Sequence, residues 1–209
     1  MRKNDYWISI SDLMSGVVGV LVLFFVVSIL TIVGTQIAAQ EEKQRGAREV
    51  VQKLSERSKD KDIYQGIGFF SSNGLIRLED SSFSQGSACI NERQKDWLRQ
   101  QMSDIIIEEL TKNSQLGVQI EGHTDIVPVG TSKASNARTC APFDDNYTLS
   151  AGRAREARNA LFSNVDSTQA DWMKRVSVVG YGSDRLIDTQ NPESQKNRRV
   201  EIRFVNIDN

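Results

Sequence analysis

The sequence predicts an α+β protein with a single N-terminal transmembrane helix, a helical linker and one globular α/β domain. Three observations support this class: an uncharged apolar run near the N-terminus, a charged segment after it, and strand-like and helix-like patterns in the rest. A chain of 209 residues, 39% apolar and 25% charged, can form one ordinary domain with appendages. We expect an N-terminal segment over residues 1–12, a transmembrane helix over 13–34, a linker over 35–62 and a domain over 63–209.

The apolar run extends from Leu13 to Val33 and contains 21 residues without a charge. At about 1.5 Å per residue, a helix of this length spans the hydrocarbon layer of about 30 Å. A cleaved signal peptide is the alternative, but its apolar core is shorter, at about 7–15 residues, and Ala38-Ala39 lie late for a cleavage site. We expect a membrane helix, which can begin near Trp7. The lysines and arginines on its two sides do not decide its orientation.

The predicted linker is rich in charge and weakly amphipathic. Residues 36–62 carry seven Lys or Arg and six Asp or Glu, with no proline and one glycine. Apolar residues recur at helical spacing, namely Ile37, Ala47, Val50, Val51 and Leu54. One narrow apolar stripe fits two interpretations: a solvated spacer, or a helix that pairs with a copy of itself or lies on the membrane as a plug.

The globular domain contains strand-like and helix-like segments in a mixed order. Strands are predicted at Tyr64–Phe70, Leu75–Leu78, Gly117–Glu121, Val176–Tyr181 and Arg199–Phe204. Helices are predicted at Glu92–Thr111 and Ser150–Phe162. The first helix is expected to bury Trp97, Leu98, Met102, Ile105, Ile106 and Leu110.

The composition excludes several classes of function. A net charge of -1 without a long basic tract makes nucleic acid an unexpected partner. One histidine and two cysteines exclude a zinc ribbon or a haem site built from this chain alone. His123 and Asp125 have the H-x-D spacing of some metal ligands, but a metal site needs at least three protein ligands, so His123 is interpreted as structural. We find no nucleophile–base pair and expect neither enzymatic activity nor a cofactor.

Four motifs in the second half carry more specific information. A strand reading VQIEGHTD ends at Asp125, and the second helix opens with NYTLS before Arg153. Residues 178–187 read VVGYGSDRLI, and residues 197–202 read NRRVEI. Together these motifs resemble the OmpA-like peptidoglycan-binding domain over about residues 63–207. The resemblance implies an α/β sandwich with a mixed sheet, helices on one face of that sheet, and binding of peptidoglycan in the periplasm.

The chemistry of these motifs fits a zwitterionic or multiply carboxylated ligand. Its ammonium group needs an acceptor and its carboxylate needs a planar fork of donors, and Asp125 facing Arg153 supplies both. In the OmpA-like family an aspartate and an arginine at these positions hold the diaminopimelate group. The resemblance predicts a binding set of Thr124, Asp125, Asn146, Leu149, Arg153 and Arg198. The alternative is that Asp125 and Arg153 form a plain surface ion pair.

Two further details concern the same half of the chain. Of the arginines in the Asn197-Arg198-Arg199 motif, we expect one to hydrogen-bond the pocket and the other to pair with acids of the domain. Residues 126–145 are an insertion relative to the family and contain Cys140, whereas Cys89 precedes the first helix. A disulfide between the two cysteines is expected in an oxidising compartment. This predicts a single-pass protein of the bacterial inner membrane with a cytoplasmic N-terminus and a periplasmic domain.

An acidic residue, Asp12, lies at the N-terminal edge of the apolar run. If the helix begins near Trp7, Asp12 lies about one and a half turns inside it, and an intramembrane acid is a functional candidate by default. The alternative is that Ser11 or Asp12 caps the helix at the interface. Asp12 shares one helix face with Ser15, Gly16, Gly19 and Leu23, and the small residues there allow another helix to approach closely.

The combination of Trp7, Asp12 and Ser15 on a helix that leads to an OmpA-like domain resembles the B subunit of flagellar stators. The resemblance implies that Asp12 is the ion-carrying site with Ser15 beside it. It further implies that the ion is H+ or Na+, and that a dimer of B subunits lies within a ring of five polytopic A subunits.

The motif around Asp12 differs from the flagellar one. Flagellar members usually read YADFxTAMMAFF, whereas residues 10–16 read ISDLMSG and are more similar to the B subunit of the Zorya anti-phage system. Three interpretations stay open: a Zorya-type defence motor, a flagellar motor, and a passive envelope tether that uses the helix only as an anchor. A motor requires a titrating intramembrane acid and a polytopic partner, and a tether requires neither.

Overall fold

The computed structural model describes residues 5–58, 67–83, 86–129, 143–165 and 170–207. The chain forms two compact units, Met1–Lys43 and Gln44–Asn209.

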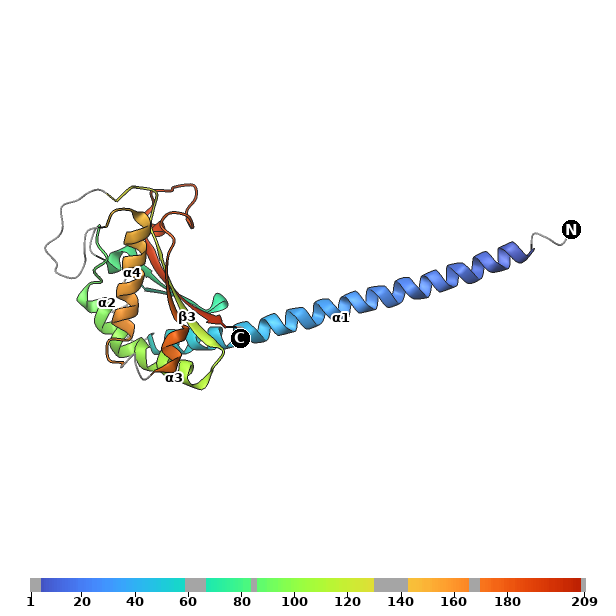
Figure 1. The fold of residues 1–209 in the computed structure, drawn as a ribbon, viewed down its shortest axis with the longest axis horizontal. Helices are drawn as coiled ribbons and strands as arrows, with labels where there is room; N and C mark the ends of the chain where they lie inside the picture. The colour runs from blue at the N-terminus through green and yellow to red at the C-terminus, as the bar shows by residue number, and fades with distance from the viewer. Residues whose placement is uncertain (1–4, 59–66, 84–85, 130–142, 166–169, 208–209) are drawn as a thin grey trace. The chain divides into compact units, whose positions relative to one another are not determined.

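The first unit is the N-terminal part of helix α1, which runs from Asp5 to Ser58 (Figure 1). Its segment Ile10–Ala38 is 29 residues long and apolar enough to cross a membrane. None of the side chains of this segment's most apolar stretch is buried. The prediction of one transmembrane helix is therefore confirmed, and the apolar segment begins before residue 13.

The second unit begins inside α1, at Gln44. Ala47, Val50, Val51 and Leu54 are at most 6% exposed and belong to the hydrophobic core. The apolar stripe of the predicted linker therefore packs into the domain. The predicted domain start at residue 63 is corrected to residue 44, and neither a spacer nor a membrane plug describes this part of the helix.

Two contacts hold this end of α1 against the domain. Lys53 Nζ lies 2.7 Å from Glu109 Oε1, on helix α3 (Ser103–Lys112). Ala47 packs against the turn at Gly74, whose φ of +61° favours glycine. A Cβ at position 74 would also lie 2.6 Å from the Cβ of Ala47. Gly74 is therefore required both by its backbone conformation and by the close approach of α1.

A five-stranded mixed sheet forms the centre of the second unit, with the strand order β1-β2-β5-β3-β4. The strands are β1 (Ile67–Phe70), β2 (Leu75–Glu79), β3 (Leu116–His123), β4 (Val176–Gly180) and β5 (Arg199–Asn206). β3 and β4 are parallel, and the other neighbours are antiparallel. Each strand lies within two or three residues of its predicted position, so the predicted mixed sheet is confirmed.

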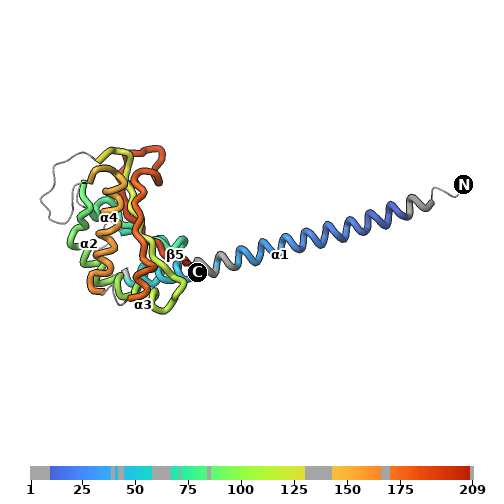
Figure 2. The backbone as a smooth tube through the Cα atoms, viewed as in Figure 1, coloured from blue at the N-terminus to red at the C-terminus, as the bar shows by residue number. Residues whose placement is uncertain are grey.

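Helices cover one face of this sheet (Figures 1 and 2). They are α2 (Glu92–Trp97), the π-helical turn η3 (Leu98–Met102), α3 (Ser103–Lys112) and α4 (Asn146–Leu161). The first three form the predicted helix at 92–111, and all of its expected core residues are buried except Ile105, which is half-buried. α4 begins four residues earlier than predicted, because Asp145 caps it by accepting from the Thr148 N–H in a capping box.

The opposite face of the sheet carries a ladder of buried ion pairs. Glu201 is 1% exposed, and its Oε1 lies 2.7 Å from Arg199 Nε and 3.0 Å from a terminal nitrogen of Arg77. Arg203 also pairs with Glu201, and its Nε lies 3.0 Å from Glu121 Oε2. Burial by itself raises the pKa of Glu201, but Arg199, Arg203 and Arg77 lower that pKa to about 2.

The packing of α1 generates a first prediction. Leu54→Ala should lower the free energy of unfolding of a fragment spanning residues 44–209 by about 2–5 kcal/mol, because it leaves a cavity in the core. Gln52→Ala is the matched control: Gln52 is exposed on the same helix, and its replacement should change that free energy by less than about 0.5 kcal/mol. Urea unfolding measures both. Equal effects of the two substitutions would contradict the packing of α1 into the core.

The ion-pair ladder generates a second prediction, on pH. The lowered pKa of Glu201 stabilises the fold fully above its ordinary value of 4.5, and this stabilisation is lost as the pH falls toward about 2. Between pH 6 and pH 3, Glu201→Gln should therefore lose about 2 kcal/mol less unfolding free energy than the parent fragment. Glu92→Gln, at an exposed carboxylate that pairs with Lys95, should retain nearly the parent's pH dependence. A Glu201→Gln variant with the parent's slope would refute this assignment.

Candidate functional site

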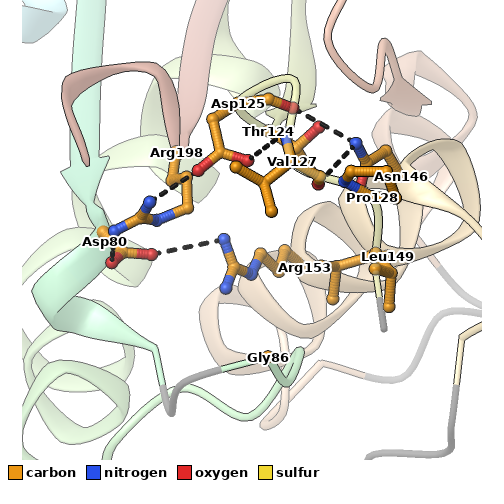
Figure 3. A pocket seen from close by; sticks show the side chains of 11 residues that line it. Asp80, Gly86, Thr124, Asp125, Val127, Pro128, Asn146, Leu149, Arg153 and Arg198 are labelled. Atoms are coloured by element: carbon orange, nitrogen blue, oxygen red, sulfur yellow. Dashed lines mark hydrogen bonds and ion pairs between the residues drawn. The ribbon is translucent and has the colours of Figure 1, made fainter. Parts of the chain in front are cut away.

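A pocket of about 310 Å³ lies at the edge of the sheet where β3 ends and α4 begins (Figure 3). Its lining comes from segments far apart in the sequence: Asp80, Gly86, Thr124, Asp125, Val127, Pro128, Val129, Asn146, Leu149, Arg153 and Arg198. All six residues of the predicted binding set are among them. The fold therefore brings the predicted set together in one cavity.

The loop after β3 positions the first acid of the pocket. Thr124 N–H donates to the carbonyl of Gly182 over 2.8 Å, which fixes the chain as it leaves the strand. Asp125 is 5% exposed, and its Oδ1 accepts from the Val127 N–H over 3.1 Å. One carboxylate oxygen thus holds the loop, and the other, Oδ2, faces Arg198.

Arg198 bridges two acids (Figure 3). One terminal nitrogen lies 2.6 Å from Asp125 Oδ2, and the other lies 2.9 Å from Asp80 Oδ2. The hydrogen bond to Asp80 is the main reason that the pKa of Arg198 is raised, with a further contribution from Asp125. Arg198 directly precedes β5, so the pocket arginine of the Asn-Arg-Arg motif is identified.

Arg153 projects from α4 into the pocket and is 1% exposed. Its Nε donates to the carbonyl of Ser87 over 3.0 Å, and a terminal nitrogen lies 3.5 Å from Asp80 Oδ1. Its guanidinium also lies 5.0 Å from the centre of the Phe83 ring. Burial lowers the pKa of Arg153, and the charge of Asp80 opposes this effect. The guanidinium is therefore held in place on several sides.

The charges of the pocket pair through a third residue, Asp80, that the prediction did not include. Asp125 and Arg153 line one pocket, but Asp125 pairs with Arg198, and Arg153 pairs with Asp80. Asp125 and Arg153 thus face the same cavity, as predicted, and the alternative of a surface ion pair between them is wrong. Asp80 is the reason, because it provides the acid that faces both arginines.

Sequence reasoning missed Asp80, which directly follows β2 in the short helix η2 (Asp80–Ser82). β2 and β3 are both antiparallel to β5, so they run in the same direction and their carboxyl ends meet at one edge of the sheet. Asp80 follows β2 there, and Thr124-Asp125 follow β3. An acid two residues beyond the predicted strand Leu75–Leu78 was the signal that could have identified it.

The neutral members of the set have distinct tasks. Asn146 Nδ2 donates to the carbonyls of Asp125 and Val127, over 3.2 and 3.1 Å, and so ties the loop after β3 to the start of α4. Leu149 is buried and forms an apolar part of the wall. Thr124 Oγ1 is buried and has no hydrogen-bond partner in the described part of the chain. A buried hydroxyl without a partner in a pocket wall is a candidate donor or acceptor for a ligand.

The other two residues of the Asn-Arg-Arg motif are structural. Asn197 is fully buried, and its side chain bonds five backbone groups of residues 187–192. Arg199 pairs with Glu201 in the sheet, as expected for the second arginine. Glu121, His123 and Glu201 could meet at a metal ion by distance. Their carboxylates already pair with Arg77, Arg199 and Arg203, so these acids are interpreted as part of the ion-pair ladder.

The insertion at 126–145 contributes to the pocket through its described ends. Val127, Pro128 and Val129 line the cavity. Cys89 is half-buried and disulfide-bonded. Cys140 and the rest of residues 130–142 lie outside the described residues, so the pairing of Cys89 with Cys140 stays a prediction.

The second group of predicted site residues lies in the first unit. α1 begins at Asp5, so Asp12 lies inside the helix, and the alternative that Ser11 or Asp12 caps it is wrong. Ser15 Oγ donates to the carbonyl of Ser11 over 2.8 Å. Asp12 and Ser15 are exposed, and a Cβ added at Gly16 would meet no atom within 4 Å. The described residues of this chain therefore do not cover the face of α1 that carries Asp12, Ser15 and Gly16.

Comparisons with known proteins agree with this architecture. A model of the OmpA family matches residues 82–199, which is more than half of the chain. No curated protein matches the sequence. The crystal structure of a MotB-like protein from Desulfovibrio vulgaris is 19% identical, with a TM-score of 0.55, and the match covers 80% of this chain and 99% of that one. This likeness supports the fold.

Two further solved structures are similar over smaller parts of the chain. The cell wall anchor of the T6SS from Pseudomonas aeruginosa is 21% identical with a TM-score of 0.49, over 74% of this chain and 97% of that one. The periplasmic domain of Helicobacter pylori MotB is 21% identical with a TM-score of 0.44, over 63% and 75%.

Proposed function

This chain belongs to the OmpA family, and from that premise we propose that its globular unit binds peptidoglycan and anchors a membrane motor to the cell wall. The observation that carries the proposal is a pocket in which two aspartates face two arginines at one sheet edge. Such a pocket has no net charge, so a ligand group with one positive and one negative charge enters it without leaving an uncompensated charge.

The ligand group is the free end of diaminopimelate in the peptide stem of peptidoglycan. It carries an ammonium and a carboxylate on one carbon atom. The carboxylate binds between Arg153 and Arg198, which present planar sets of N–H donors. The ammonium binds to Asp125, and the unpaired hydroxyl of Thr124 supplies a neutral hydrogen bond. Binding replaces part of the contact between Arg198 and Asp125, and Asp80 keeps both arginines in place.

At the membrane end, we assign the chain as the B-type subunit of an ion-driven motor. Asp12 lies inside an apolar helix. A carboxylate there is energetically costly, so an acid at this position is a candidate for a functional role. It takes up H+ or Na+ with Ser15 beside it, against a polytopic A-type subunit and a second copy of this chain. The sequence ISDLMSG at residues 10–16 favours a Zorya-type anti-phage motor in the bacterial inner membrane, with the globular unit in the periplasm.

The wall anchor and the ion-carrying acid require each other in this function. Each unit charge that crosses the membrane releases about 2.3 kcal/mol per 100 mV. This energy produces motion of one part relative to another only if one part is held. The peptidoglycan pocket holds the B subunit, so that ion passage at Asp12 moves its partner.

Peptidoglycan binding gives a third prediction. Asp125→Asn should weaken sedimentation of the detergent-solubilised full chain with diaminopimelate-containing sacculi by tenfold or more, because the amide removes the charged acceptor of the ligand ammonium and one of the two carboxylates that pair with Arg198. Asp171→Asn is the matched control, since Asp171 pairs with Lys174 outside the pocket and should bind as the parent does.

Two further measurements define the outcome. Thermal unfolding of each variant separates a binding defect from loss of the fold. Sacculi stripped of their peptide stems should not bind, because the pocket recognises the stem. Undiminished binding by a folded Asp125→Asn variant, or equal binding to stripped sacculi, would overturn the pocket assignment.

The ion-carrying role gives a fourth prediction. Asp12→Asn should leave the chain associated with its polytopic partner but abolish phage protection in cells that carry the complete system, because the amide is nearly isosteric and cannot titrate. Ser28→Ala is the control on the same helix, since Ser28 Oγ donates to the carbonyl of Phe24 within that helix. Co-purification and plaque counts measure the two properties. Full protection by Asp12→Asn would leave only the passive tether.

A further inference from the structure

A second hollow of about 400 Å³ lies beside the pocket. It is lined by Arg77, Glu79, Asp80, Ser81, Ile187, Gln195, Lys196 and Arg198. Two of these residues, Asp80 and Arg198, also line the pocket described above. The two cavities are therefore neighbours, and a single ion pair of 2.9 Å between Arg198 and Asp80 forms their common wall.

The lining of the second hollow includes a lysine, Lys196, which the lining of the pocket does not. Arg77 pairs with Glu201, and Arg198, which pairs with Asp80 and Asp125, is the arginine proposed to bind the ligand carboxylate in the first pocket. Lys196 is exposed and forms no ion pair within the described part of the chain. Its ammonium can therefore pair with an anionic group of a ligand in this hollow.

The position of Lys196 is well defined by its surroundings. It lies in the short helix η5 (Gln195–Asn197), which ends at the buried Asn197. The Ser194 side chain accepts from the Lys196 N–H and caps this helix. Asn197 in turn bonds the backbone of residues 187–192, including the stretch that begins at Ile187 in the hollow. The backbone that presents the Lys196 ammonium is thus held by the same network that places Arg198.

We propose that the second hollow binds the acidic residue that neighbours the diamino acid in the peptide stem, with Lys196 pairing its free carboxylate. This inference rests on the proposed binding of the diamino acid in the first pocket. A ligand held there at Arg153 and Arg198 continues across the Asp80–Arg198 wall and reaches the second hollow. Gln195 and Ser81 supply side-chain hydrogen-bonding groups for its peptide backbone.

A matched pair of ligands tests this inference on the full chain in detergent. The probes are the tripeptide Ala-γ-Glu-diaminopimelate and its analogue in which the glutamate carboxylate is an amide. The parent should bind the carboxylate form about two- to fivefold more tightly, as an ion pair near the protein surface contributes about 0.5–1 kcal/mol. Lys196→Gln should abolish this preference without weakening the amide form. Lys174→Gln, at an exposed lysine outside both cavities, should retain the preference.

The possible failures are distinguishable. Equal binding of the two tripeptides by the parent, or an unchanged preference in Lys196→Gln, would overturn the second hollow and leave the first pocket intact. Absence of binding of both tripeptides to the parent would overturn the proposed peptidoglycan site together with this extension. Calorimetry at low and high salt should also show the preference shrinking with ionic strength if Lys196 acts by charge.

Discussion

The position of β5 between β2 and β3 is the constraint on which the pocket depends. The register pairs Arg199 with Glu79 of β2 and with His123 of β3. Arg198, one residue before the strand, therefore lies between the chains that leave β2 and β3 and reaches both Asp80 and Asp125. Because β5 is antiparallel to both β2 and β3, its start lies beside the ends of these two strands.

The same strand also organises the opposite face of the sheet. Its alternate residues Arg199, Glu201 and Arg203 point away from the helices, whereas Ile202 lies in the core. Buried charges are costly unless they are paired, so the ladder is compatible with one register. A slip of one residue would bring Glu201 into the apolar core. The ion pairs of the ladder therefore also stabilise the strand register that places Arg198 at the edge of the sheet.

Helix α1 contains an apolar segment suited to a membrane and, further along, residues that pack into the core of the globular unit. Its apolar segment Ile10–Ala38 carries Asp12, and its last turns supply Val51 and Leu54 to the core of the domain proposed to hold the wall. The sequence predicted both helical segments correctly but assigned the second to a linker. Helical spacing shows that a stripe is apolar, whereas the surface that covers it is known only once the sheet and α3 have formed.

The sequence by itself determined the membrane helix and the order of strands and helices, and it predicted one binding set for Asp125, Arg153 and Arg198, which line one pocket in the structure. The helix and the order of elements depend on local periodicity, whereas the binding set is what the resemblance of four motifs to the OmpA-like family implies. Only the tertiary structure decided which charges pair. Asp80 lies 73 residues from Arg153 and 118 residues from Arg198 along the chain, and no local pattern records such a contact. The contact forms because β5 inserts between β2 and β3, and because charges buried at that edge must find partners there.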